Sequence, residues 1–199
     1  MLKLAKKFGF IVLLAFLLAA CSKENKQKLE DVKKKVEERI DTLTKKDTTT
    51  SPRYECVLNP TKGNKVKGTL SIWRKGGDLY IQGEITGLTE GKHGFHIHDK
   101  GDCSAPDASS AGDHFNPTGK QHGKMGKDSH MGDLENIKAD NMGMAKVDMK
   151  LDADYWMLSG PNSIVGRSIV VHADEDDLKT QPSGNSGKRV ACGVIEKAK

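Results

Sequence analysis

Residues 65–85 read KVKGTLSIWRKGGDLYIQGEI, and this stretch decides the fold class. On both sides of Gly76-Gly77, apolar residues alternate with polar ones, so each half has one apolar and one polar face. A period of two is typical of a β-strand with one buried face. Because a glycine pair fits a tight turn, the stretch predicts two strands joined as an antiparallel hairpin.

The same alternation recurs along the chain, and no amphipathic helical pattern separates the apolar segments. The sequence therefore predicts an all-β fold, an eight-stranded antiparallel sandwich or barrel. The predicted strands are Tyr54–Leu58, Lys65–Ile72, Leu79–Ile85, His93–Asp99, Asp133–Ala139, Ala145–Leu151, Val165–His172 and Arg189–Ile195. Two connections, 100–132 and 173–188, are far longer than a hairpin needs, which predicts functional loops.

The 199-residue chain carries 32 basic and 27 acidic residues, but the excess of positive charge lies outside the predicted β domain. Residues 52–199 hold twenty of each sign. A nucleic-acid-binding domain would concentrate Lys and Arg in its folded part, so this class of partner is excluded. Glycine and proline are also concentrated from position 52 onward, which predicts a single domain over residues 53–199.

The first 20 residues have the pattern of an export signal. Three lysines precede an uncharged run over residues 8–20, which is too short for a permanent membrane helix. The run ends Leu18-Ala19-Ala20-Cys21, which resembles a bacterial lipoprotein signal with Cys21 as the lipidated residue. We therefore expect an exported lipoprotein, anchored in a membrane through acyl chains on Cys21 and facing the periplasm or the cell surface.

A charged segment then leads to the domain. Residues 22–51 are rich in Lys and Glu, and apolar residues recur in them at spacings of three and four. The segment is shorter than three heptads, so we interpret 21–52 as a tether, with a helix that pairs with a partner as the alternative.

Six of the seven histidines fall into a pattern typical of metal sites. His96 and His98 lie two apart on a predicted strand, so both imidazoles project from one face. His93 has the opposite parity to His96 unless Gly94 introduces a bulge, which indicates a structural role with hydrogen bonds to backbone. The remaining candidate ligands are His114, His122, His130, Asp133 and His172. Six imidazoles and one carboxylate suit two metal ions, and imidazole favours copper and zinc.

Five segments of the sequence resemble copper/zinc superoxide dismutases, in the order and spacing of that family. They are Gly91–His98, Gly112–Pro117, His130–Leu134, Gly166–His172 and Gly184–Ile195. The resemblance covers roughly residues 54–196. It implies a Greek-key arrangement of the strands, and conversion of superoxide to dioxygen and hydrogen peroxide through a Cu(II)/Cu(I) cycle.

The resemblance also implies the ligands of one copper and one zinc ion per chain. Copper would be bound by His96, His98, His114 and His172. Zinc would be bound by His114, His122, His130 and Asp133, with His114 bridging the two ions. Asp176, or alternatively Asp177, would accept hydrogen bonds from His96 and His122. Arg189 would hold the anionic substrate beside the copper.

The family pattern further implies a disulfide between Cys103 and Cys192, which agrees with export. Cys56 is left over, and its position on a predicted strand indicates core packing. Substrate steering would need local positive charge near Arg189. The candidate lysines are Lys120, Lys124, Lys127, Lys179 and Lys188.

The function predicted from the sequence is that of a membrane-anchored, extracytoplasmic superoxide dismutase. Two alternatives are a lipoprotein that stores or delivers copper and zinc without turnover, and an adhesive surface domain. All four predicted copper ligands and Arg189 are present, which favours the enzyme. The sequence is compatible with a homodimer but does not distinguish it from a monomer.

Overall fold

The computed structural model describes Lys33 and residues 53–199. The predicted signal peptide over 1–20, the lipidation site Cys21 and the tether over 21–52, with its helical alternative, lie outside these residues apart from Lys33. In the described part of the chain, no helix combines the length and the apolar character needed to cross a membrane.

The described domain is built from nine β-strands and one short 3₁₀ helix, Ser109–Ala111. The strands are β1 Tyr54–Pro60, β2 Lys67–Lys75, β3 Asp78–Thr86, β4 Gly91–His93, β5 Phe95–His98, β6 Ile137–Ala139, β7 Ala145–Asp152, β8 Ser168–His172 and β9 Arg189–Lys197. All neighbouring strands pair antiparallel, which confirms the predicted fold class.

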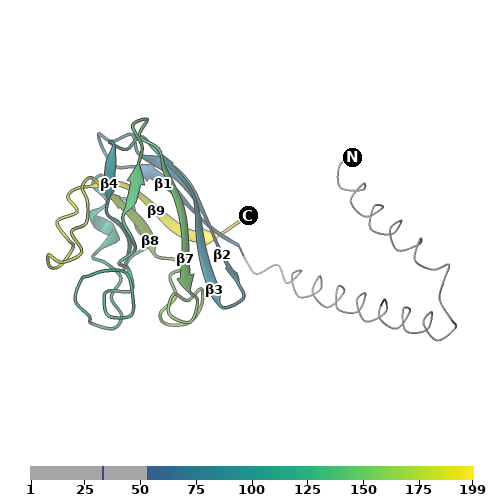
Figure 1. Ribbon diagram of the computed structural model, residues 1–199. Helices are drawn as coiled ribbons and strands as arrows, with labels where there is room; N and C mark the ends of the chain where they lie inside the picture. Colours follow the sequence, from purple (N-terminus) through teal and green to yellow (C-terminus); the bar gives the residue numbers. More distant parts are fainter. Residues whose placement is uncertain (1–32, 34–52) are drawn as a thin grey trace, which may run out of the picture. The chain divides into compact units, whose positions relative to one another are not determined.

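The strands form one sheet that curls into a nearly closed barrel (Figure 1). Their order is β4-β6-β7-β3-β2-β1-β9-β8-β5, so β4 and β5 lie at opposite edges although they follow one another in the chain. The connection through Gly94 therefore joins the two edges. β3 and β4 are also consecutive but are separated in the sheet by β7 and β6, as in a Greek key.

The predicted hairpin forms the centre of the sheet. β2 and β3 pair in register up to Lys75 and Asp78, with Gly76 in a left-handed conformation at φ 63°. The alternating apolar residues of both strands are fully buried, and they pack with those of β7 in one core. These side chains include Leu70, Ile72, Leu79, Ile81, Ile85 and Val147.

The structure has one strand more than predicted because the segment 93–99 divides at Gly94. The pairing of β4 with β6 ends before Gly94. The N–H of Gly94 donates to the carbonyl of Asp174, and its carbonyl accepts from the N–H of His172. A Cβ at this position would lie 2.7 Å from the Cβ of Ser186, so the close approach requires glycine.

A second difference concerns residues 133–139, of which only Ile137–Ala139 form a strand. The preceding residues 133–136 leave the sheet and contribute side chains to the site described below. The predicted strand 165–172 likewise begins at Ser168, because the preceding residues form a turn in which the N–H of Arg167 bonds to the carbonyl of Ile164.

Candidate metal centre

The alternation in β5 places its two histidines on one face. Phe95 and Ile97 point into the apolar core, and His96 and His98 point to the opposite face, where both are nevertheless buried. His114, in the loop after β5, forms an isolated bridge with His98. His172 is the last residue of β8, the antiparallel neighbour of β5.

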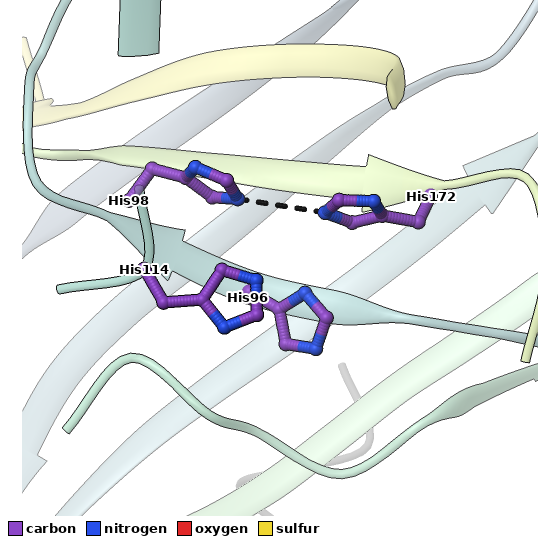
Figure 2. A group of neighbouring side chains, drawn as sticks. All are labelled: His96, His98, His114 and His172. Carbon is purple, nitrogen blue, oxygen red and sulfur yellow. Dashed lines mark hydrogen bonds between the residues drawn. The ribbon is translucent and has the colours of Figure 1, made fainter. Parts of the chain in front are cut away.

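These segments bring four imidazoles together, drawn in Figure 2. The group comprises His96, His98, His114 and His172, and is called here the four-histidine group. One ligand nitrogen of each lies within 4.8 Å of all the others. The structure thus juxtaposes the four residues that the resemblance assigns to copper.

Hydrogen bonds select which nitrogen of each imidazole faces the centre of this group. Nδ1 of His98 lies 2.9 Å from the carbonyl oxygen of Gly112, and Nδ1 of His172 lies 3.3 Å from that of Gly187. Each Nδ1 therefore carries the proton, and each Nε2 presents a lone pair. The two Nε2 atoms are 3.4 Å apart (dashed in Figure 2), an arrangement that a cation between them would stabilise.

A second cluster, called here the Asp133 group, comprises His114, His122, His130 and Asp133. Oδ1 of Asp133 lies 2.8, 3.0 and 3.4 Å from the Nδ1 atoms of His114, His122 and His130. Its other oxygen, Oδ2, accepts hydrogen bonds from the backbone N–H groups of Gly123 and His130. The carboxylate is thus oriented by Oδ2, and Oδ1 faces the three imidazoles.

His114 belongs to both groups. Its Nδ1 faces Asp133, while its Nε2 is buried and has no hydrogen-bond partner among the described residues. The rings of His114 and His96 lie close, with centroids 4.0 Å apart. One imidazole therefore directs a nitrogen to each cluster, as a bridging ligand does.

Four buried side-chain nitrogens in the described residues lack a hydrogen-bond partner, and all belong to the two groups. They are Nδ1 of His96, Nε2 of His114, Nδ1 of His122 and Nδ1 of His130. Buried polar atoms are rarely left unpaired, so these atoms point to an additional bonding partner. In tetrahedral zinc sites, neighbouring ligand atoms are about 3.3 Å apart. The distances from Oδ1 of Asp133 to the Nδ1 atoms of the three histidines are close to this value. The residues fit two metal ions.

Asp176 links the two groups through their histidines. Its Oδ2 lies 2.6 Å from Nε2 of His96, and its Oδ1 lies 3.0 Å from Nε2 of His122. Of the two candidates, Asp176 therefore makes the contacts with His96 and His122. The exposed Asp177 instead accepts hydrogen bonds from Thr180 in its own loop. Asp176 leaves the Nδ1 atoms of both histidines free to bind a metal ion.

Burial lowers the pKa of His96, His98, His172 and His130, whereas neighbouring carboxylates raise the pKa of His122. Burial lowers the pKa of His96 to about 4 and those of His98 and His172 well below their usual range, so these imidazoles are neutral ligands at pH 7. Burial also disfavours the charged form of His122, but Asp133 and Asp176 outweigh it and raise its pKa to about 9. A cation at Nδ1 of His122 would compete with that proton.

Arg189 lies at the edge of the four-histidine group. Its Nη1 and Nη2 donate to the carbonyls of Ala108 and Gly112, both at 2.6 Å. Burial lowers the pKa of its guanidinium, which nonetheless stays charged at neutral pH. The side chain lines a cleft of about 700 Å³, together with His98, His114 and His172.

The lysines expected to steer substrate are not among the residues that line this cleft, whereas Lys100 is. Two of them form ion pairs elsewhere: Lys120 with Asp128 at 3.4 Å and Lys127 with Asp152 at 2.9 Å. No sequence pattern singles out Lys100, because its place in the cleft beside Arg189 depends on the path of the loop after β5.

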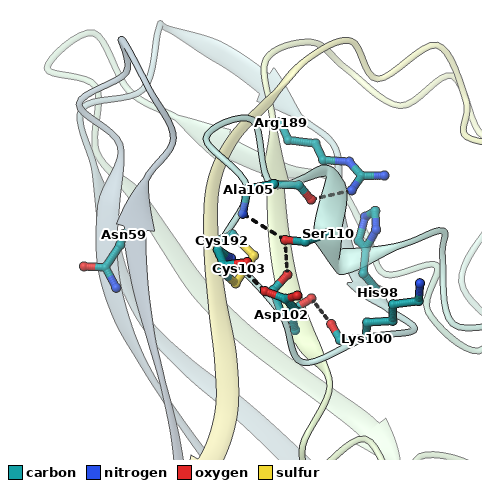
Figure 3. The surroundings of a disulfide bond; sticks show 12 residues. Asn59, His98, Lys100, Asp102, Cys103, Ala105, Ser110, Arg189 and Cys192 are labelled. Atoms are coloured by element: carbon teal, nitrogen blue, oxygen red, sulfur yellow. Dashed lines mark hydrogen bonds between the residues drawn. A yellow bond between two sulfur atoms is a disulfide. The ribbon is translucent and has the colours of Figure 1, made fainter.

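A disulfide joins Cys103 to Cys192 and fixes that loop to β9 (Figure 3). The same loop supplies the two carbonyls that hold Arg189, which lies three residues before Cys192 in the sequence. Cys56 is a free cysteine and is fully buried in the core, as predicted from its position in the alternating pattern of the first strand.

Two polar residues that the sequence did not point to hold the loops around the site. The side chain of Asn136 exchanges hydrogen bonds with the backbone of Asp176, at 2.8 and 2.9 Å. The amide of Gln181 likewise bonds the backbone N–H and carbonyl of His122, both at 2.8 Å. No sequence motif identifies Asn136 or Gln181 as part of the site, because each contact joins residues at least 40 positions apart.

His93 is buried outside both groups. Its Nδ1 lies 2.9 Å from the carbonyl oxygen of His172, and its Nε2 lies 3.0 Å from that of Thr89. It therefore contacts backbone, as its parity predicted.

Comparisons with known proteins agree with this geometry. The sequence pattern of the family "Copper/zinc superoxide dismutase (SODC)" matches residues 66–195. The chain is 44% identical over 149 residues to the extracellular superoxide dismutase [Cu-Zn] of Brugia pahangi, covering 70% of this chain and 73% of that protein. It is 43% identical over 146 residues to the superoxide dismutase [Cu-Zn] of Onchocerca volvulus, covering 67% and 90%.

Among solved structures, the crystal structure of the clock protein EA4 matches with a TM-score of 0.66 and 38% identity. The match covers 75% of this chain and 97% of that chain. Because the family match spans more than half of the sequence and the relatives are aligned over most of their length, the chain belongs to the copper/zinc superoxide dismutase family, whose members bind copper and zinc.

Proposed function

We propose that this superoxide dismutase binds copper at the four-histidine group and zinc at the Asp133 group, and acts outside the cytoplasm while anchored by lipid on Cys21. The observation that carries the assignment is the division of His114, whose Nδ1 faces Asp133 and whose Nε2 faces the four-histidine group. When bound, copper would supply a one-electron redox couple and zinc a fixed positive charge.

The protein's own residues supply substrate binding and a proton site. Arg189 is held by two carbonyls at the rim of the cleft, so its guanidinium can bind a monoanionic dioxygen species without titrating. Nε2 of His114 is the atom that can hold a proton during turnover, because it faces this site while Nδ1 faces the Asp133 group, where zinc would be bound.

Asp176 and the second long loop fix the metal-binding nitrogens. The carboxylate accepts from Nε2 of His96 and of His122, so the two rings cannot rotate independently. Its own backbone is held by Asn136. The ligands of both sites are thereby positioned before any metal ion binds.

Extracytoplasmic location is supported by three features. The chain contains a disulfide, which persists in oxidising compartments. A relative is named an extracellular superoxide dismutase. The sequence before Cys21 has the pattern of a lipoprotein signal, and a chain lipidated there would be held at the membrane surface.

The enzymatic assignment is tested by changing Arg189→Ala and measuring superoxide consumption beside copper and zinc content. We expect kcat/KM to fall by about tenfold or more, because a donor to the reacting anion is lost, with one copper and one zinc still bound per chain. Arg74→Ala is the matched control, since the ion pair of Arg74 among the described residues is with the exposed Asp154. Full metal occupancy without turnover in the unmodified protein would instead indicate a metal-binding lipoprotein.

Membrane anchoring is tested separately. A labelled fatty acid should be incorporated into the unmodified protein and not into Cys21→Ser, and dismutase activity should move from the membrane fraction to the soluble fraction. Equal membrane association of both proteins would contradict the proposed anchor.

A further inference from the structure

Arg167, the residue before β8, connects three segments that are distant in the sequence. Its Nη1 donates to the backbone oxygen of Asp99 at 2.5 Å and to its carboxylate at 2.6 Å. Its Nε donates to the carbonyl of Ser163 at 2.9 Å. The face of its guanidinium covers the ring of Phe115, with Cζ 3.4 Å from the ring centroid.

The residues that Arg167 contacts are sequence neighbours of the four-histidine group. Asp99 directly follows His98, and Phe115 directly follows His114. His172 ends the strand that begins immediately after Arg167. One side chain therefore contacts the residues that directly follow two of the four histidines, and it precedes the strand that carries a third.

Phe115 transmits this contact to His114 because its surroundings leave it little freedom. Its ring is buried, its N–H donates to the carbonyl of Ile97 at 2.8 Å, and its carbonyl accepts from the N–H of Gly132 at 2.8 Å. A displaced ring would move a peptide unit shared with His114. The guanidinium closes the remaining side of this ring.

The contacts of Arg167 require a planar cation. A guanidinium can donate in its plane to two segments while its face stacks on an aromatic ring, whereas the ammonium of lysine is a point charge. The side chain of Arg167 is only 20% exposed but that of Asp99 is 53% exposed, so solvent screens the ion pair and the stacking on Phe115 is the better-shielded contact.

We propose that Arg167 is a positioning residue that holds His98 and His114 at the spacing required to bind copper. The inference rests on the proposed assignment of copper to the four-histidine group. Zinc shares only His114 with this arrangement. Its other three ligands, Asp133, His122 and His130, are held by Asp176, Gln181 and backbone N–H groups.

The test is a copper titration of the zinc-loaded, full-length protein against a competing chelator, with the electron paramagnetic resonance spectrum of Cu(II) recorded in parallel. The variants are Arg167→Lys, which keeps the charge, and Arg167→Ala. Arg74→Ala serves as the control for loss of an arginine. We expect copper affinity to fall by about tenfold in Arg167→Lys, with an altered copper spectrum and a smaller change in zinc affinity.

A purely structural role would lower the melting temperature and leave the copper affinity and spectrum of the folded variant unchanged. That result, or an equal loss of copper and zinc affinity, would overturn the proposal. Should Arg167→Ala fail to fold, the comparison rests on Arg167→Lys. If the unmodified protein binds no copper at this group, the assignment of copper itself fails, whereas normal binding in both proteins refutes only the role of Arg167.

Discussion

Asp176 and Asp177 are chemically identical neighbours with unrelated contacts. Asp176 is buried and accepts bonds from His96 and His122, one on each side of the bridging imidazole. Asp177 is exposed and accepts from Lys179 and Thr180, which shapes the loop alone. The direction of the backbone at this point decides which carboxylate reaches the metal ligands.

This pair provides a prediction with an internal control. In Asp176→Asn, the amide NH₂ cannot accept a hydrogen bond, so one of the two imidazoles loses its acceptor. We expect metal affinity to fall by about 10- to 100-fold, measured by competition with a chromophoric chelator. Asp177→Asn should bind both metals with nearly unchanged affinity, and equal losses in the two variants would argue against the role of Asp176.

Cys56 gives a second prediction at the scale of one residue. Burial raises the pKa of its thiol to about 12, from 9.0 in an exposed setting. The unfolded chain therefore ionises first, so the stabilising contribution is complete below about pH 9 and is lost as the pH rises toward 12. In a Cys21→Ser background, we expect no reaction with a thiol reagent at pH 8 until the protein is unfolded, and then one thiol per chain.

The free energy of unfolding provides the check. Cys56→Ala should be less stable than its parent at pH 7 by about 1–2 kcal/mol, and this difference should shrink above pH 9. A rapidly reacting thiol in the native protein would show that Cys56 is not packed in the core.

At the scale of elements, the loop between β5 and β6 is held to the barrel at its start and its end. The disulfide from Cys103 attaches the start to β9, and the N–H of Lys100 donates to the carbonyl of Ala111. The end is held by Gly132, whose carbonyl accepts from the N–H of Ile97 at 2.9 Å, an approach so close that a Cβ at this position would clash with the Ile97 carbonyl. These attachments position His114 and the carbonyls that hold Arg189.

Removal of the disulfide should therefore affect both stability and turnover. The bond spans 89 residues, and loss of a cross-link of that length costs about 3–5 kcal/mol in free energy of unfolding. We expect Cys103→Ser to lower the melting temperature and also kcat/KM, because Ala108 and Gly112 lose their fixed position relative to Arg189. Calorimetry and superoxide consumption at full metal loading measure the two effects, and a loss of stability with unchanged kcat/KM would limit the disulfide to a structural role.

At the scale of the whole domain, residues 52–199, charge is balanced in number but not in position. Residues 52–199 hold equal numbers of basic and acidic residues, so net charge gives no long-range attraction for superoxide. Two cations, Lys100 and Arg189, line the cleft beside the four-histidine group. Two acidic residues, Asp99 and Asp113, also line it, and the carboxylate of Asp99 is paired with Arg167.

We therefore expect Lys100 to contribute to substrate capture. In Lys100→Ala, kcat/KM should fall several-fold at low ionic strength, and its dependence on salt should weaken, because a local attraction for the anion is removed. Stopped-flow measurement of superoxide decay over a salt series tests this. Lys179→Ala is the control, since Lys179 is exposed and is not among the residues lining the cleft; an equal effect in both would indicate a general loss of charge.

Much of this architecture could be predicted without coordinates. Alternation over 65–85 and 145–151 specified strands whose apolar faces are buried, because a strand repeats every two residues regardless of its neighbours. The histidines of the four-histidine group and the Asp133 group could be selected because imidazole and carboxylate are common ligands of copper and zinc. The sequence allows a bulge at Gly94 but does not predict that 93–99 divides between two sheet edges, because that depends on hydrogen bonds with the distant residues Asp174 and His172.

The sequence by itself determined the fold class, the family and the residues capable of binding metal, since these depend on local periodicity and on residue chemistry. Only the tertiary structure decided which nitrogen of each histidine is free, that Asp176 rather than Asp177 joins the two groups, and that Arg167 and Lys100 lie beside the site. The physical reason is that these properties arise from contacts between distant segments, whose geometry is set when the sheet closes through Gly94.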